Sequence, residues 1–121
     1  MTRGKISGIY SSILLGLKNV DGVKLIALGN RDGFLIGEEE TDEMEMLALM
    51  SATLLRSAEI ITNRLEKTGP KHVIVDFKGG KLVAASAGQK ALISVVAAQD
   101  ADLDNIITEL TSTAEKIKEI L

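Results

Sequence analysis

The stretch DEMEMLALMSATLLRSAEIITNRLEK, from Asp42 to Lys67, contains neither glycine nor proline and decides the fold. Asp42 followed by Glu45 is typical of a helix N-terminus, where acidic side chains favour the positive end of the helix dipole. At 1.5 Å per residue the predicted helix is on the order of 40 Å long. That is very long for a chain of 121 residues.

Apolar residues occur on several sides of this helix. At about 100° per residue, one stripe is expected to face the chain's own sheet: Leu47, Met50, Leu54, Ala58, Ile61 and Leu65. A second stripe lies well round the cylinder: Met46, Leu49, Thr53, Arg56 and Ile60. A third side carries Ala48, Ala52 and Leu55. A helix side that faces water does not need apolar residues. We therefore expect these further sides to be covered, either by a terminal helix of the same chain or by a second copy of the chain. Two-fold homodimers are the commonest assembly, which favours the second copy.

Downstream of the long helix the pattern changes to short apolar runs separated by tight turns. Strands are predicted over His72–Phe77, Leu82–Ala87 and Ala91–Ala97, and together they form an antiparallel meander. The first of these strands has Val73, Ile74 and Val75 in a row and little charge to protect it at a sheet edge. The strand is therefore a second element that needs a partner.

Upstream of the long helix, apolar spacings of three and four predict a helix over Lys5–Leu17. Val23–Leu28 and Phe34–Gly37 flank the tetrapeptide Asn30-Arg31-Asp32-Gly33 and predict a β-hairpin. The tetrapeptide has neither a lysine nor a run of glycines to hold phosphate, so it is interpreted as a turn. A last amphipathic helix, begun by Asp100 or Asp102, gives the order α-β-β-α-β-β-β-α and an α+β fold.

Length and composition predict one domain, residues 1–121, with 45% apolar residues and a net charge of -3. There is no cysteine, and neither a signal peptide nor a membrane-spanning apolar run is recognisable, which predicts a soluble cytoplasmic protein. The 14 basic residues are outnumbered by 17 acidic ones, and only three residues are aromatic. Binding of nucleic acid is therefore not expected.

No motif predicts catalysis, a cofactor or a metal site. His72 has no partner motif, and the acidic run Glu38–Glu45 lacks the alternating ligands and central glycine of a calcium loop. Lys78-Gly79-Gly80-Lys81 is followed by Leu82 and a strand, whereas a phosphate-binding loop requires Ser or Thr and a helix. Ala84–Gly88 resembles a nucleophile elbow only loosely, because no histidine follows it. The protein is not expected to be an enzyme.

The whole chain resembles the Roadblock family, which includes dynein light chains, Mgl-type regulators of bacterial polarity GTPases and subunits that scaffold Rag GTPases. The likeness rests on five features: Val20–Val23, the hairpin Ala27–Ile36, the helix alanines Ala48, Ala52 and Ala58, the strand Leu92–Val95, and the segment Asp100–Leu103. The resemblance implies a five-stranded antiparallel sheet between one long helix and the two terminal helices.

The resemblance also implies that two chains pair through the long helix and the third strand. The corresponding residues here are Met46, Leu49, Thr53, Arg56, Ile60, His72, Val73, Ile74, Val75 and Phe77. Family members are non-catalytic platforms, many of which bind or stimulate small Ras-like GTPases. The expected function is thus that of a homodimeric scaffold or regulatory module for a small GTPase or a larger complex, with Arg56 and Arg64 as candidate polar contacts. The alternative is a small-molecule sensor of profilin-like architecture, in which the small residues Ala84–Gly88 leave room for a ligand.

Overall fold

The computed structural model describes residues 2–37 and 41–121, with side chains from Gly8 onward. Glu38–Glu40, the first part of the acidic run, lie outside the described residues. The elements follow the chain in this order: α1 (Thr2–Lys18), β1 (Val23–Asn30), α2 (Asp42–Glu66), β2 (Val73–Phe77), β3 (Gly80–Ala87), β4 (Ala91–Ala97) and α3 (Leu103–Ile120).

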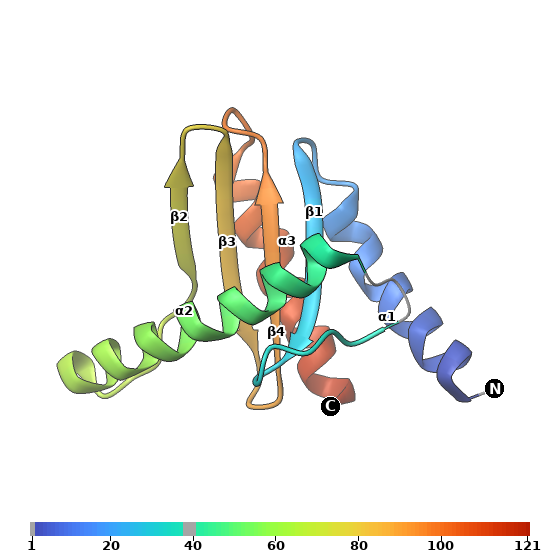
Figure 1. Ribbon diagram of the computed structural model, residues 1–121, viewed down its shortest axis with the longest axis horizontal. Helices are drawn as coiled ribbons and strands as arrows, with labels where there is room; N and C mark the ends of the chain where they lie inside the picture. Colours follow the sequence, from blue (N-terminus) through green and yellow to red (C-terminus); the bar gives the residue numbers. More distant parts are fainter. Residues whose placement is uncertain (1, 38–40) are drawn as a thin grey trace.

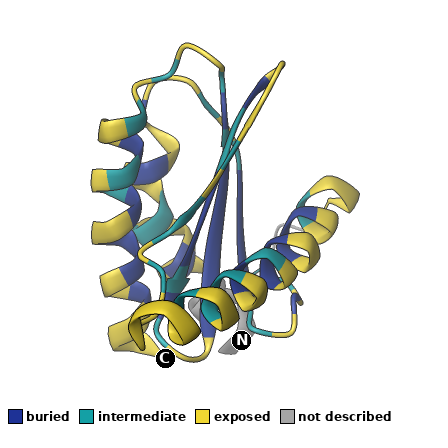
Figure 2. Ribbon diagram, turned by 90° about the vertical axis from the view of Figure 1, so that its left-hand side faces the viewer, coloured by how far each residue is buried: buried dark blue, intermediate teal, exposed yellow. Residues whose placement is uncertain are grey.

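The molecule has three layers. The sheet lies in the middle, α2 crosses one of its faces, and α1 and α3 cover the other (Figures 1 and 2). This is the α+β arrangement of one long helix opposite two terminal helices that the resemblance to the Roadblock family implies.

The sheet is antiparallel throughout and has the strand order β1-β4-β3-β2. The central strands β3 and β4 are joined by a tight turn at Gly88 and have little exposed surface. The order leaves β1 at one edge and β2 at the other. The strand predicted over His72–Phe77 spans Val73–Phe77 and lies at an edge, where its low charge leaves it little protected.

The prediction of five strands is wrong, because the described residues form four. Phe34–Gly37 contributes one isolated bridge, between Leu35 and Gly29, and its pairing with β1 ends at the hydrogen bond that the Ile36 N–H donates to the Leu28 carbonyl at 2.9 Å. Gly37 follows with φ of 113°, a left-handed conformation that turns the chain out of the strand direction. The hairpin is thus present, but its second arm is too short to be a strand.

The main core lies between the sheet and the pair α1 and α3. Its largest fully buried side chains include Leu17, Ile93, Ile106, Leu110 and Ile117. Asp102 caps α3, since its Oδ1 accepts a hydrogen bond from the Asn105 N–H at 3.2 Å. Of the two residues predicted to begin this helix, Asp102 is the one that does so.

The long helix begins at Asp42, as predicted, but its N-cap is the preceding residue and not Asp42. Thr41 is the N-cap, and its Oγ1 accepts a hydrogen bond from the Met44 N–H at 3.1 Å. Asp42, Glu43 and Glu45 occupy the first turn, where they face the positive end of the helix dipole. Lys67, with φ of 60°, ends the helix in a left-handed cap.

Candidate functional site

The side of α2 that packs on the sheet is the side with small residues. The buried residues of α2 are Leu47, Ala48, Ser51, Ala52 and Leu55. The stripe predicted to face the core is turned by about 90° from this side, and of its members only Leu47 is buried, whereas Met50, Ile61 and Leu65 are 48%, 57% and 73% exposed. The prediction of the core face was therefore wrong.

Close packing explains why the small residues face inward. Ala52 and Leu55 contact Ala84 and Leu92 of the sheet. Ser51 lies over β4, where its hydroxyl donates a 2.7 Å hydrogen bond to the hydroxyl of Ser94, and both residues are fully buried. Short side chains on both surfaces let the helix axis approach the sheet more closely than a stripe of leucines and methionines allows.

The helix crosses the sheet obliquely and covers only part of it. In Figure 1, α2 leaves the upper parts of β2, β3 and β4 bare on the near face. Leu25, Leu82 and Val96 pack against the edge of the α2 cluster and are only half-buried. Val73 belongs to the same face, so strand alternation places Val75 and Phe77 there too. We call these five residues, Leu25, Val75, Phe77, Leu82 and Val96, the open sheet strip.

One flank of α2 borders the open sheet strip. Leu47 packs beside Leu25, Leu82 and Val96, and Met50 and Leu54 lie within about 60° of Leu47 around the helix. Ile61 lies on the same flank, about two turns beyond Leu54. The flank and the open sheet strip adjoin each other and form one partly exposed apolar surface, which we call the trough.

The last two turns of α2 extend beyond the sheet. In Figure 1 this end of the helix projects past β2, and in Figure 2 the end nearest the viewer is exposed on all sides. Ile60, Ile61 and Leu65 are 56%, 57% and 73% exposed. Three large apolar side chains thus stand on a helix end that has no sheet of its own beneath it.

The helix residues predicted to pair with a second chain are all exposed. Met46, Leu49 and Ile60 are 58%, 49% and 56% exposed, and Thr53 and Arg56 are also exposed. They lie on the outward side of α2 and on the flank away from the open sheet strip. Arg64 is exposed as well.

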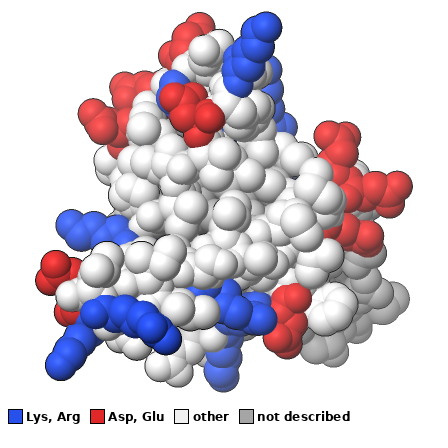
Figure 3. Space-filling view, turned by 60° about the vertical axis from the view of Figure 1, so that its left-hand side comes forward, with Lys and Arg blue, Asp and Glu red and all other residues white. Residues whose placement is uncertain are grey.

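The strand residues predicted to pair with a second chain lie at or next to β2. His72 precedes the strand and is half-buried, as are Val73 and Val75, while Ile74 and Phe77 are 40% and 43% exposed. Among the described residues β2 pairs only with β3, so the backbone groups on its outer side meet no described strand. Figure 3 brings this side of the molecule forward and shows that the middle of the surface carries no charge, whereas charged side chains lie around it.

The loop Asn30–Gly33 turns the chain and also supports α2. Asn30 Oδ1 accepts hydrogen bonds from the N–H groups of Asp32 and Phe34, each at 3.0 Å. Gly33 has φ of 94°, and an added Cβ there would lie 2.8 Å from Leu49 Cα. The loop is therefore pressed against the helix at a point where only glycine fits.

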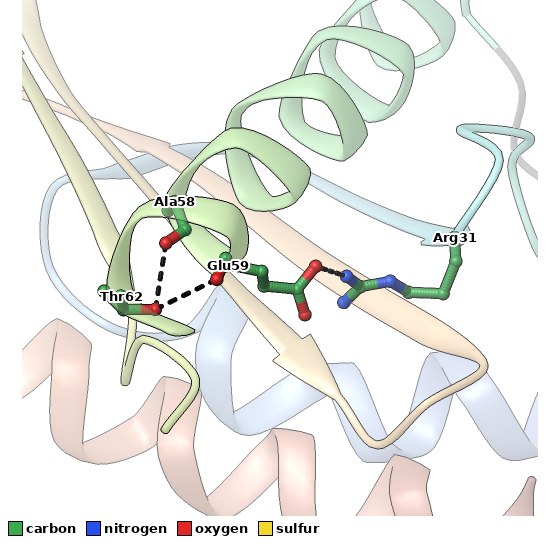
Figure 4. A network of polar contacts seen from close by, with 4 residues as sticks. All are labelled: Arg31, Ala58, Glu59 and Thr62. Atoms are coloured by element: carbon green, nitrogen blue, oxygen red, sulfur yellow. Dashed lines mark hydrogen bonds and ion pairs between the residues drawn. The ribbon is translucent and has the colours of Figure 1, made fainter. Parts of the chain in front are cut away.

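An ion pair ties the same loop to the C-terminal half of α2. Arg31 Nη2 donates to Glu59 Oε1, and the two side chains point toward one another in Figure 4. On the next turn Thr62 Oγ1 donates to the Ala58 carbonyl at 2.9 Å. The pair fixes the helix near the point where it leaves the sheet.

Most of the stretch predicted to leave room for a ligand, Ala84–Gly88, is packed, although its end at Ala87 and Gly88 borders an open hollow of about 350 Å³ beside Lys118. Ala84, Ala85 and Ala87 are at most 6% exposed, because the small residues let the helices approach the sheet from both faces. In the part of the chain that the structure describes, no three His, Asp or Glu side chains are close enough to hold a metal ion. None of the helices described is long and apolar enough to span a bilayer.

Val75 and Phe77 of the open sheet strip are among the predicted interface residues, but the sequence reasoning missed the other three members, Leu25, Leu82 and Val96. These three residues stand in strands predicted from short apolar runs, and the alternation of side chains between the two faces of a strand places them on the α2 side of the sheet. That alternation carries no information on the angle at which a helix crosses the face. Only the three-dimensional arrangement distinguishes the covered rows from the open ones.

Comparison with known proteins gives a consistent result for the fold. The family model of the Roadblock/LC7 domain matches residues 10–97. No curated protein is significantly similar in sequence.

Three solved structures resemble the chain over 94% of its length. One, described as MglB with a tetrameric arrangement, has a TM-score of 0.83 and 18% identity over 88% of its own chain. MglB from Thermus thermophilus, a gliding protein, has a TM-score of 0.82 and 17% identity over 89% of its chain. A Roadblock/LC7 domain from Streptomyces avermitilis has a TM-score of 0.81 and 16% identity over 95% of its chain. At these identities the likeness establishes the fold.

Proposed function

The chain belongs to the Roadblock/LC7 family, and from this premise we propose that it is a homodimeric, non-catalytic module that docks or modulates a small Ras-like GTPase. Roadblock/LC7 domains are regulatory and scaffold domains and are not known as enzymes. The observation that carries the proposal is the apolar surface of α2 and the sheet, which the described part of the chain leaves uncovered.

Self-association explains three features of this surface together. A two-fold axis beside β2 sets the outer edges of two β2 strands against each other in antiparallel pairing. The same axis carries the projecting end of each α2 over the partner's sheet. There it enters the trough between the partner's α2 and the open sheet strip, so that Ile61 and Leu65 meet apolar groups.

The outward residues of α2 complete the proposed interface. Met46, Leu49, Thr53, Arg56 and Ile60 line the exposed back of the helix, as the sequence reasoning proposes for the pairing surface. In the two-helix layer of a dimer they either border the partner helix or form the platform on which a GTPase docks. The likeness to MglB supports the GTPase as partner class, and the exposed Arg56 and Arg64 provide positive charge for it.

Charge substitutions test the self-association. Met50→Glu and Ile61→Glu each place a carboxylate in the trough. Because the dimer is symmetric, its interface then contains two such carboxylates. We expect a loss of at least about 3 kcal/mol, or more than about a hundredfold in the dimer dissociation constant. Ser112→Glu, an equally exposed helix position on α3, is the control and should leave the dimer intact. Equal dissociation constants for the trough variants and the control would contradict the proposed interface.

A capture experiment tests the proposed partner class. The immobilised protein is incubated with extract of its own cells, loaded with GTP analogue or with GDP, and bound proteins are identified by mass spectrometry. We expect a small GTPase whose recovery depends on the nucleotide and falls for Arg56→Glu and Arg64→Glu. Lys116→Glu on α3 should not change it. Recovery of no GTPase with either nucleotide would remove this part of the proposal and leave the dimer untouched.

A further inference from the structure

The outer edge of β2 presents backbone groups from alternate residues. Phe77 and Gly80 face each other across the two-residue turn between β2 and β3. In an antiparallel hairpin the pair that flanks a two-residue turn is hydrogen-bonded, and bonded pairs recur at every second residue. The register of β2 on β3 is regular, so the N–H and carbonyl groups of Ile74 and Asp76 point away from β3.

This edge is accessible in the described structure. Ile74 is 40% exposed, Asp76 is exposed, and no described residue outside the sheet forms a hydrogen bond with their backbone groups. The hairpin arm and the first turn of α2, which flank the undescribed residues 38–40, lie by β1 at the opposite edge (Figure 1). His72 directly precedes β2, and alternation gives its backbone groups the same outward direction.

In the homodimer proposed above, the position of the two-fold axis along β2 decides which residues of the two strands face each other. With the axis at Ile74, this residue pairs with its own copy, and Asp76 pairs with the partner's His72. All three outward residues then exchange backbone hydrogen bonds across the interface.

Every neighbouring register loses part of this ladder. An axis at Val75 or at Asp76 sets one outward residue opposite the partner's Lys78, which lies in the β2–β3 turn. An axis at Val73 sets Asp76 opposite the partner's Pro70, which has no N–H to donate. Backbone pairing therefore favours the axis at Ile74.

The side chains favour the same register. Since Val73 packs toward α2, the side chains of Ile74 and Asp76 lie on the other face of the sheet. With the axis at Ile74, the two isoleucines face each other and each Asp76 faces an imidazole. With the axis at Asp76 two carboxylates face each other, which destabilises a strand pair. Lys81 of β3 lies opposite Asp76 within each chain in any register, so it does not distinguish between them.

On the premise of the proposed homodimer, we propose that its two β2 strands pair with Ile74 on the two-fold axis and with Asp76 of each chain opposite the partner's His72. The β2 edge is then complementary to itself, because its two ends match when the strand is reversed. On the α2 side, Val73 faces the partner's Val75, so the apolar row of one sheet continues into the other.

Single cysteines report the register, because the chain has no cysteine of its own. Ile74→Cys, Val75→Cys and Asp76→Cys are oxidised at micromolar concentration, and the covalent dimer is measured on non-reducing gels. Ile74→Cys should form most of it, because directly opposite Cα atoms lie about 5.5 Å apart, a distance that a disulfide spans. The other two should form no more than the control Ser112→Cys on α3, because their copies lie more than about 7 Å apart.

A charge swap gives an independent readout. His72→Glu sets two pairs of carboxylates opposite each other and should raise the dimer dissociation constant about two- to thirtyfold. Adding Asp76→Lys should restore most of the affinity. Adding Glu115→Lys, an exposed position on α3, gives the same net charge and should restore none.

Three results would overturn the proposed register and leave the dimer itself in place. They are more covalent dimer from Val75→Cys or Asp76→Cys than from Ile74→Cys, no covalent dimer from any of them although light scattering gives the mass of two chains, and no rescue by Asp76→Lys. A wild-type protein with the mass of one chain would instead remove the proposed homodimer and the register with it.

Discussion

At the scale of single residues, the position of α2 on the sheet depends on the pair Ser51 and Ser94. Their hydroxyls are fully buried and bonded to each other at 2.7 Å. A buried hydroxyl that loses its partner costs about 1–3 kcal/mol, whereas removal of both partners costs less. The pair therefore fixes the register of the helix on the sheet more than it adds net stability.

Urea unfolding of serine variants checks this. Ser94→Ala is expected to lower the free energy of unfolding by about 1–3 kcal/mol because Ser51 keeps a buried hydroxyl. Ser51→Ala/Ser94→Ala is expected to lose less than the sum of the two single changes, by about 1 kcal/mol. Additive losses would show that the two hydroxyls act independently.

Gly33 is the second residue on which the position of α2 depends. With φ of 94° and Leu49 Cα 2.8 Å from an added Cβ, Gly33→Ala should destabilise the protein by about 1–3 kcal/mol in the same urea measurement. Gly69→Ala is the matched control, since nothing lies within 4 Å of its added Cβ. A Gly33→Ala protein as stable as the control would contradict the described packing of the loop under the helix.

Sequence reasoning at this scale correctly identifies Asn30–Gly33 as a turn, because Asn and Gly have strong local preferences. It does not reveal the second role of the loop. The Arg31–Glu59 ion pair joins residues 28 apart in the sequence, and the contact of Gly33 with Leu49 depends on the height of the helix above the sheet. Local turn preferences can therefore be predicted from the sequence, whereas contacts between distant residues depend on how the elements pack.

At the scale of elements, the sequence pattern of α2 predicts that a helix forms, but it does not predict which side of the helix faces the sheet. The absence of Gly and Pro and the acidic first turn predict the helix correctly. The larger apolar stripe indicates the wrong core face, because a helix with apolar residues on three sides has no single hydrophobic face. The inward side is set by the small residues opposite it in the sheet, such as Ala84 and Ser94.

The projecting end of α2 gives a prediction about dynamics. Its apolar residues have no sheet beneath them in one chain, and isolated helix ends fray readily. In the wild-type dimer, the amides of residues 60–66 should therefore exchange slowly. In Met50→Glu, which the account predicts to be monomeric, they should exchange at least about tenfold faster, while β4 stays protected. Equal exchange in both proteins would mean that the partner chain does not cover this end.

At the scale of the whole molecule, the sheet has two edges and the chain treats them differently. The β2 edge carries one charged residue, Asp76, and lies next to a broad apolar surface, whereas the β1 edge carries Lys24 and is partly covered by the hairpin arm. An edge that adjoins a broad apolar surface suits symmetric pairing with an identical chain, because the pairing also buries that surface.

The mass of the purified protein in solution tests the central claim most directly, and it is measured by size-exclusion chromatography with light scattering across micromolar concentrations. The account predicts about twice the 12.9 kDa of one chain for the wild type. It predicts the mass of a single chain for Ile61→Glu. A wild-type protein that stays at the mass of one chain over this range would contradict the claim that a second copy covers α2 and the open sheet strip.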